Sequence, residues 1–139
     1  MREIKFRAWD KRRKKWLEPH YVDISCAGVI SKVTVHRGYE IASDRNLDFI
    51  ELMQYTGLKD KNGKEIYEGD IIEIRGQNYK YIAEIIWDDE KAGYDLKEIN
   101  TSIPDYLLNM PELFVDRISQ IKVIGNIYEN PELLEGEIK

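Results

Sequence analysis

Apolar and polar residues alternate along much of the chain, with the period of two that is typical of β-strands. Near the N-terminus, Ile4, Phe6 and Ala8 alternate with charged residues, which predicts a strand over 3–9. A charged stretch follows, and apolar residues resume at Trp16. The segment 15–18 is therefore the expected hairpin partner of the first strand.

The next third of the chain gives a weaker signal. Residues 29–35 are rich in β-branched side chains and should be extended. The polar stretch 43–46 could cap a short helix. Residues 48–55 fit one face of a helix and also one face of a strand, and we favour a strand.

Turn residues become frequent from position 57 onward, and they separate short apolar segments. Asn62-Gly63 is a strong turn dipeptide, because both residues tolerate positive φ. The segments between turns predict strands over 71–75, 79–88, 94–99 and 120–128. In the segment 79–88 the expected inward side chains are Tyr81, Ala83, Ile85 and Trp87.

Short strands at close spacing predict a mainly β chain, α+β overall. Strands over 70–99, closed by 120–128, suit a small SH3-like barrel. We therefore expect an N-terminal β-rich or α+β subdomain over 1–50, packed with an SH3-like barrel over 51–139. The segment 102–118 combines two prolines with large apolar residues, and we expect it to be a helical excursion of short turns, or an irregular loop, packed on the sheet of that barrel.

Composition narrows the class of protein. The 139 residues are 42% apolar and 34% charged, which excludes low-complexity and wholly disordered chains. The longest apolar run, 26–30, is far shorter than the roughly 20 residues of a membrane helix, and no secretory signal follows Met1. The single cysteine, Cys26, lies in an apolar stretch and is expected to be buried. We expect a cytoplasmic protein with no membrane contact.

Charge is distributed unevenly along the chain. The net charge is −5, yet the first 20 residues hold eight basic and three acidic side chains. The densest block of cations could bind nucleic acid, but it lies where a solvated turn between two strands is expected, and the acidic remainder of the chain disfavours phosphate. This block consists of Lys11, Arg12, Arg13, Lys14 and Lys15.

Three blocks of this sequence resemble the signatures of the YopX family of phage and prophage proteins. They are Phe6-Arg7-Ala8-Trp9-Asp10, the uninterrupted stretch 54–71, and the stretch 123–134. The resemblance implies a phage or prophage of a low-GC Gram-positive host, an SH3-type barrel in the C-terminal part, and homo-oligomers. It carries no activity, cofactor, catalytic residue or binding residue over to this chain.

Candidate catalytic groups are sparse. Glu68 and Asp70 could hold a hard cation in a metal-dependent hydrolase, but Glu68-Gly69-Asp70 is more simply a tight turn before a strand. His20 and His36 lack the spacing of metal ligands, and the chain carries none of the common nucleophile or phosphate-loop motifs. We predict no catalytic residue, no metal site and no cofactor, and we do not expect an enzyme.

Aromatic residues are the stronger functional indication. The chain has nine Tyr, three Trp and three Phe residues, and Tyr79 and Tyr81 share one strand face. That face either fills the core or contacts a partner. Our first hypothesis is a non-enzymatic, self-associating accessory protein that binds a host or phage protein through an aromatic, acidic surface. The alternatives are nucleic-acid binding through residues 11–15 and, less favoured, the hydrolase.

Overall fold

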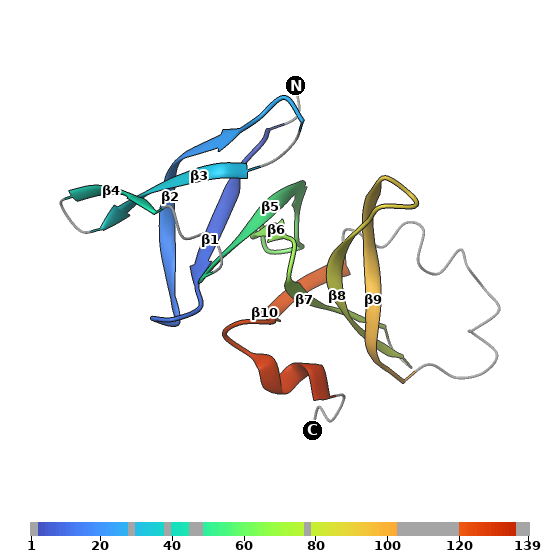
Figure 1. The fold of residues 1–139 in the computed structure, drawn as a ribbon. Coiled ribbons are helices and arrows are strands. Elements are labelled where there is room, and N and C mark those ends of the chain that lie inside the picture. The colour runs from blue at the N-terminus through green and yellow to red at the C-terminus, as the bar shows by residue number, and fades with distance from the viewer. Residues whose placement is uncertain are drawn as a thin grey trace. The chain divides into compact units, whose positions relative to one another are not determined.

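The computed structural model describes residues 3–27, 30–37, 40–44, 49–76, 79–102 and 120–135. These residues form ten strands and one 3-10 helix, with no α-helix among them, so the prediction of a mainly β chain is confirmed (Figure 1). The SH3-like barrel and the α+β layer stay predictions. The chain divides into an N-terminal unit, Ile4–Gln54, and a C-terminal unit, Tyr55–Lys139 with Met1–Glu3.

The N-terminal unit is an antiparallel sheet with the strand order β4-β3-β2-β1-β5. Its core contains Ala8, Leu17, Val33 and Ile50. Strand β5 contributes its first residues here and continues into the C-terminal unit. The strands are β1 (Phe6–Asp10), β2 (Lys15–Ile24), β3 (Ile30–Arg37), β4 (Glu40–Asp44) and β5 (Ile50–Lys59).

The predicted hairpin at the start of the chain is confirmed, but its second strand is longer than expected. Ala8 pairs with Leu17 and Asp10 with Lys15. Strand β2 then continues to Ile24, where its partner is β3. The prediction stopped before Pro19, which lacks an N–H donor for a ladder. The strand passes this residue because the register shifts there, at an irregularity between Pro19 and Tyr21.

The C-terminal unit contains a four-stranded antiparallel sheet of order β10-β7-β8-β9, and the end of β5 pairs with β6. The long β8–β9 hairpin is visible in Figure 1. The elements are β6 (Glu65–Tyr67), β7 (Asp70–Arg75), β8 (Lys80–Asp88), β9 (Gly93–Ser102), β10 (Ile121–Asn126) and η3 (Pro131–Glu135). The buried core residues are Ile66, Ile72, Ile74, Ala83, Ile85, Ile121 and Val123.

Buried polar side chains fix the turns of this unit. Asp60 accepts backbone N–H bonds from Asn62 and Lys64, and Gly63 takes the positive φ, +82°, that the sequence predicted for this turn. Asp70, only 1% exposed, accepts the N–H of Tyr67 at 2.8 Å. In the same way the Asn126 side-chain oxygen accepts the N–H groups of the turn 128–129. These residues fall within the second and third sequence blocks, so much of those blocks is structural.

Several local predictions need correction. Ala83 and Ile85 are buried as expected, but Trp87 is 45% exposed, because β8 extends past the core towards its turn. Cys26 is exposed in the turn after β2. Residues 43–44 end strand β4 instead of capping a helix. Residues 45–48 and the predicted helical excursion from position 103 onward lie outside the described residues.

Candidate functional site

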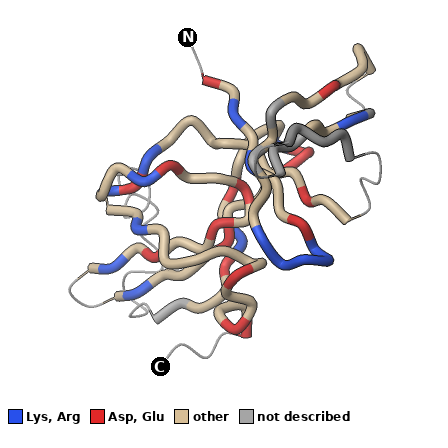
Figure 2. Tube along the Cα trace, turned by 90° about the vertical axis from the view of Figure 1, so that its left-hand side faces the viewer, with Lys and Arg blue, Asp and Glu red and all other residues tan. Residues whose placement is uncertain are grey.

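The five cations at positions 11–15 are all exposed, and they are seen as one blue stretch in Figure 2. Residues 11–14 form the turn between β1 and β2, and Lys15 is the first residue of β2. Asp10 builds this turn from beneath. Its buried carboxylate accepts the N–H groups of Arg12 at 2.9 Å and Arg13 at 3.1 Å, and its carbonyl accepts the N–H of Lys14. Burial by itself would raise the pKa of Asp10, but these two bonds and the guanidinium charges hold that pKa below its ordinary value.

Three of the five cations already have partners inside the N-terminal unit. The Lys11 ammonium lies 3.0 Å from a Glu51 carboxylate oxygen. The Arg12 guanidinium lies 4.0 Å from the centroid of the Phe49 ring, and Arg13 lies 3.9 Å from the Asp10 carboxylate. These contacts order the turn and offset part of its charge. Cationic character is therefore strongest at Lys14 and Lys15.

Tyr79 and Tyr81 both pack against the core cluster of the C-terminal unit, and both are half-buried. The Tyr79 ring lies so close to Gly76 that a Cβ atom there would overlap it. Burial raises the pKa of Tyr81, and the negative charges of Glu98 and Asp95 add to the rise. Of the alternatives for this strand face, the structure favours core packing for much of both side chains.

Glu68 and Asp70, the carboxylates of the hydrolase hypothesis, belong to the tight turn at the start of β7. Asp70 is almost completely buried, and its carboxylate accepts a hydrogen bond from the backbone N–H of Tyr67. Glu68 is half-buried in the turn before β7. Within the described ranges, no group of three or more His, Cys, Asp or Glu side chains is placed to hold a metal ion.

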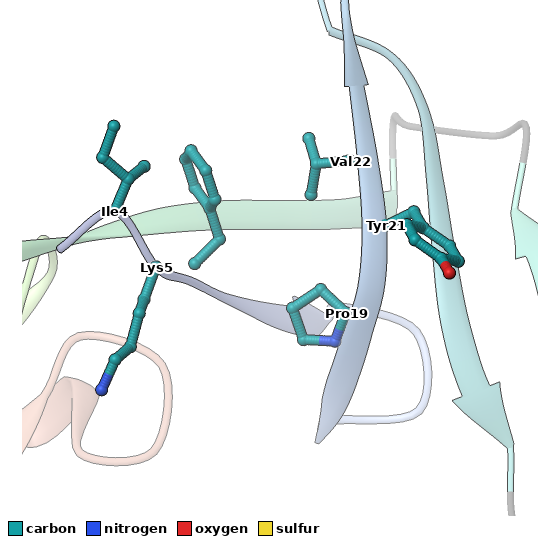
Figure 3. Close-up of a pocket in the computed structure, with 6 residues that line it drawn as sticks. Ile4, Lys5, Pro19, Tyr21 and Val22 are labelled. Atoms are coloured by element: carbon teal, nitrogen blue, oxygen red, sulfur yellow. The ribbon is translucent and has the colours of Figure 1, made fainter.

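An apolar groove in the N-terminal unit was not predicted from the sequence. It opens where β1 and β2 separate, since their ladder begins only at Ala8 and Leu17. Figure 3 shows Ile4 and Val22 facing the same space from two chain segments, with Lys5 extending on the other side. Two lining side chains are strongly exposed, Ile4 at 66% and Tyr21 at 63%. The lining residues are Ile4, Lys5, Phe6, Pro19, Tyr21 and Val22.

A second exposed apolar feature lies near the β8–β9 turn of the C-terminal unit. Trp87 pairs across the hairpin with Tyr94, ring edge to ring face, with centroids 5.1 Å apart. The indole Nε1–H donates to Asp89 at 2.9 Å, which fixes the ring. Asp88 accepts the N–H groups of Glu90 and Lys91, and so orders the turn. We call Trp87 together with the turn 88–92 the Trp87 tip.

The only signal for either surface was the presence of large apolar residues in strand sequences. Alternation predicts which side chains share a face, but it does not show where two strands separate or where a core ends. The groove and the Trp87 tip are therefore findings of the structure.

The fold and these surfaces define a two-unit, mainly β protein with large apolar side chains exposed in both units. A model of the YopX protein family matches residues 5–135, so the chain belongs to the YopX family. The crystal structure of protein EF1440 from Enterococcus faecalis is similar over 97% of this chain and 100% of its own, with 29% identity and a TM-score of 0.62. No curated protein matches the chain. Within the described residues, no helix is long and apolar enough to cross a membrane.

Proposed function

We propose that this protein is a non-enzymatic accessory protein of a phage or prophage, which acts in the host cytoplasm as a self-associating protein-interaction module. The observation that carries the proposal is the exposed apolar groove of the N-terminal unit. Large apolar side chains that remain in water, such as Ile4 and Tyr21, gain free energy when a partner covers them.

The composition of the groove suits a protein ligand. Five of its six lining residues are apolar or aromatic, and Lys5 supplies one charge. Apolar contacts of this kind hold a protein partner, while a charge at the rim orients it. Family membership supports the phage or prophage setting, and the antiparallel β10-β7-β8-β9 sheet is consistent with the SH3-like barrel that we keep as part of the proposal.

The experiment compares the light-scattering mass of the purified protein with that of Tyr21→Glu over a range of concentrations. Tyr21 is mostly exposed, so its substitution should leave the fold intact. The matched control is Cys26→Glu, which places the same charge at an exposed residue outside the groove lining. The proposal expects mass to rise with concentration in the wild type and the control, and to remain that of one chain in Tyr21→Glu. A wild type that stays monomeric throughout contradicts self-association.

Nucleic-acid binding is the second candidate, because all five side chains of the turn 11–15 are exposed. It ranks lower, since Lys11, Arg12 and Arg13 are engaged with partners of their own unit. A binding constant that falls steeply with salt would distinguish this function from docking at the groove.

A further inference from the structure

The two units carry opposite formal charge. Residues 4–54 hold ten Lys and Arg and seven Asp and Glu residues, a formal charge of +3. Residues 55–139 hold ten Lys and Arg and eighteen Asp and Glu residues, a formal charge of −8. Opposite charges on two surfaces favour their encounter and suppress contacts between like surfaces. Two copies of this chain should therefore meet through unlike units.

The groove is an exposed apolar feature of the positive unit. Its lining contains Lys5 and no carboxylate. An apolar ligand with acidic flanks would gain apolar burial in the groove and a favourable charge contact with this unit.

The Trp87 tip, on the negative unit, is an apolar side chain with acidic flanks. The indole is 45% exposed, and three carboxylates follow it at positions 88–90. Its bond to Asp89 and its contact with Tyr94 fix the ring before any partner arrives, so docking would restrict few side-chain torsions. Tryptophan is also the residue type most enriched among dominant contacts of protein interfaces.

We propose that the groove of one copy receives the Trp87 tip of a second copy. The indole packs against Ile4 and Val22, and the carboxylates of the turn approach Lys5, the charged residue of the groove lining. This inference rests on the proposed self-association and names its contact. Because each copy offers one groove and one tip, the contact is head-to-tail, and it either closes a ring or extends into a chain of copies.

The experiment mixes two variants, each lacking one half of the contact. Ile4→Asp places a charge in the groove, and Trp87→Ala removes the anchor of the tip. Both side chains are substantially exposed, and urea unfolding of each variant checks that the fold is retained. Light-scattering mass is then measured for each variant alone and for their equimolar mixture. The controls are Cys26→Asp and Leu58→Ala, which alter exposed residues outside both surfaces.

The inference expects a characteristic mixing result. Each variant alone should have the mass of one chain at concentrations where the wild type associates. The mixture should form a dimer of one copy of each, since the tip of Ile4→Asp can still enter the groove of Trp87→Ala, and growth must then stop. Glu90→Lys should weaken the wild-type association without touching the indole, and raising the salt from about 0.05 M to about 0.5 M should weaken it too.

Other results would overturn the inference in distinguishable ways. If Ile4→Asp is monomeric while Trp87→Ala associates like the wild type, the groove has another occupant and the proposed function stands alone. A mixture that remains monomeric also rejects the head-to-tail contact. If the wild type is monomeric at every concentration, both the inference and the proposed self-association fail.

Discussion

The carboxylate of Asp60 accepts a hydrogen bond from the backbone N–H of Val123, 63 residues further along the chain, at 3.0 Å. The other oxygen of the same carboxylate accepts the N–H groups of Asn62 and Lys64. A backbone bond from the Lys61 N–H to the Ile121 carbonyl closes the same contact. One buried side chain thus joins the turn after β5 to strand β10.

We expect Asp60→Ala to destabilise the C-terminal unit substantially. The substitution leaves three N–H groups without their acceptor, and each buried, unsatisfied donor costs about 1–3 kcal/mol. Because water can reach part of this turn, the expected loss in unfolding free energy is about 2–4 kcal/mol. Urea unfolding measures it. The control is Lys122→Ala, exposed on the same strand, which should change stability by less than about 0.5 kcal/mol. Equal urea midpoints for the two variants would show that the hydrogen bonds of Asp60 do not stabilise the C-terminal unit.

The same carboxylate should make stability depend on pH in the acid range. Burial would raise the pKa of Asp60, but the N–H bonds from Val123, Lys64 and Asn62, with the charge of Lys64, bring it below the ordinary value of 3.8. A group with a lowered pKa in the folded state stabilises that state above its unfolded pKa, and this contribution is lost as the pH falls through the folded pKa.

The measurement compares wild type with Asp60→Asn by urea unfolding at a series of pH values. The difference in unfolding free energy should be constant from about pH 7 to about pH 5 and should shrink below about pH 4. A difference that grows in acid would have the wrong sign. Asp10, whose pKa is lowered by the same balance, should behave alike in the N-terminal unit.

Local sequence predicted the turns and strands well, because their signals lie within a few residues. Asn62-Gly63 forms a turn with positive φ at the glycine, and residues 50–55, where two periodicities competed, are extended in strand β5. The partner of Asp60 could not be predicted in this way, since no local pattern connects it to Val123. Nor could the exposure of Trp87, because alternation gives the face of a strand and not the extent of the core.

The difference in burial between Trp87 and Ile85 predicts that their substitution by Ala has unequal effects on the stability of the protein. Trp87→Ala should cost at most about 1.5 kcal/mol, the range of one aromatic pair contact, since the indole is nearly half in water. Ile85→Ala, only two residues earlier but 6% exposed within the core cluster, should cost about 2–5 kcal/mol. Thermal or urea unfolding of both variants decides the matter. A larger loss of unfolding free energy for Trp87→Ala than for Ile85→Ala would show that Trp87 is part of the core.

The turn at Gly63 gives a test of backbone conformation alone. Its φ of +82° is unfavourable for residues with a Cβ, yet an added Cβ would meet nothing within 4 Å. Gly63→Ala should therefore destabilise the protein by about 1–2 kcal/mol through φ and not through a clash. Gly63→Asn should cost less, because Asn tolerates this region better. Similar losses for both variants, measured by urea unfolding, would point to a steric cause instead.

The cationic turn predicts only weak nucleic-acid binding with an uneven dependence on its residues. Lys11 is paired with Glu51, so its charge is partly offset, whereas Lys14 and Lys15 are exposed at the end of the turn and the start of β2. We expect a dissociation constant for short duplex DNA in the non-specific range of about 10⁻⁴–10⁻⁶ M. Reversal of both Lys14 and Lys15 to Glu should abolish binding, while Lys11→Glu should weaken it less. Fluorescence anisotropy at two salt concentrations measures this, with Lys122→Glu in the other unit as control. The opposite result is sub-micromolar binding that Lys11→Glu and the double reversal weaken equally. It would show that the whole segment 11–15 binds phosphate, and nucleic-acid binding would then replace the interaction module as the preferred function.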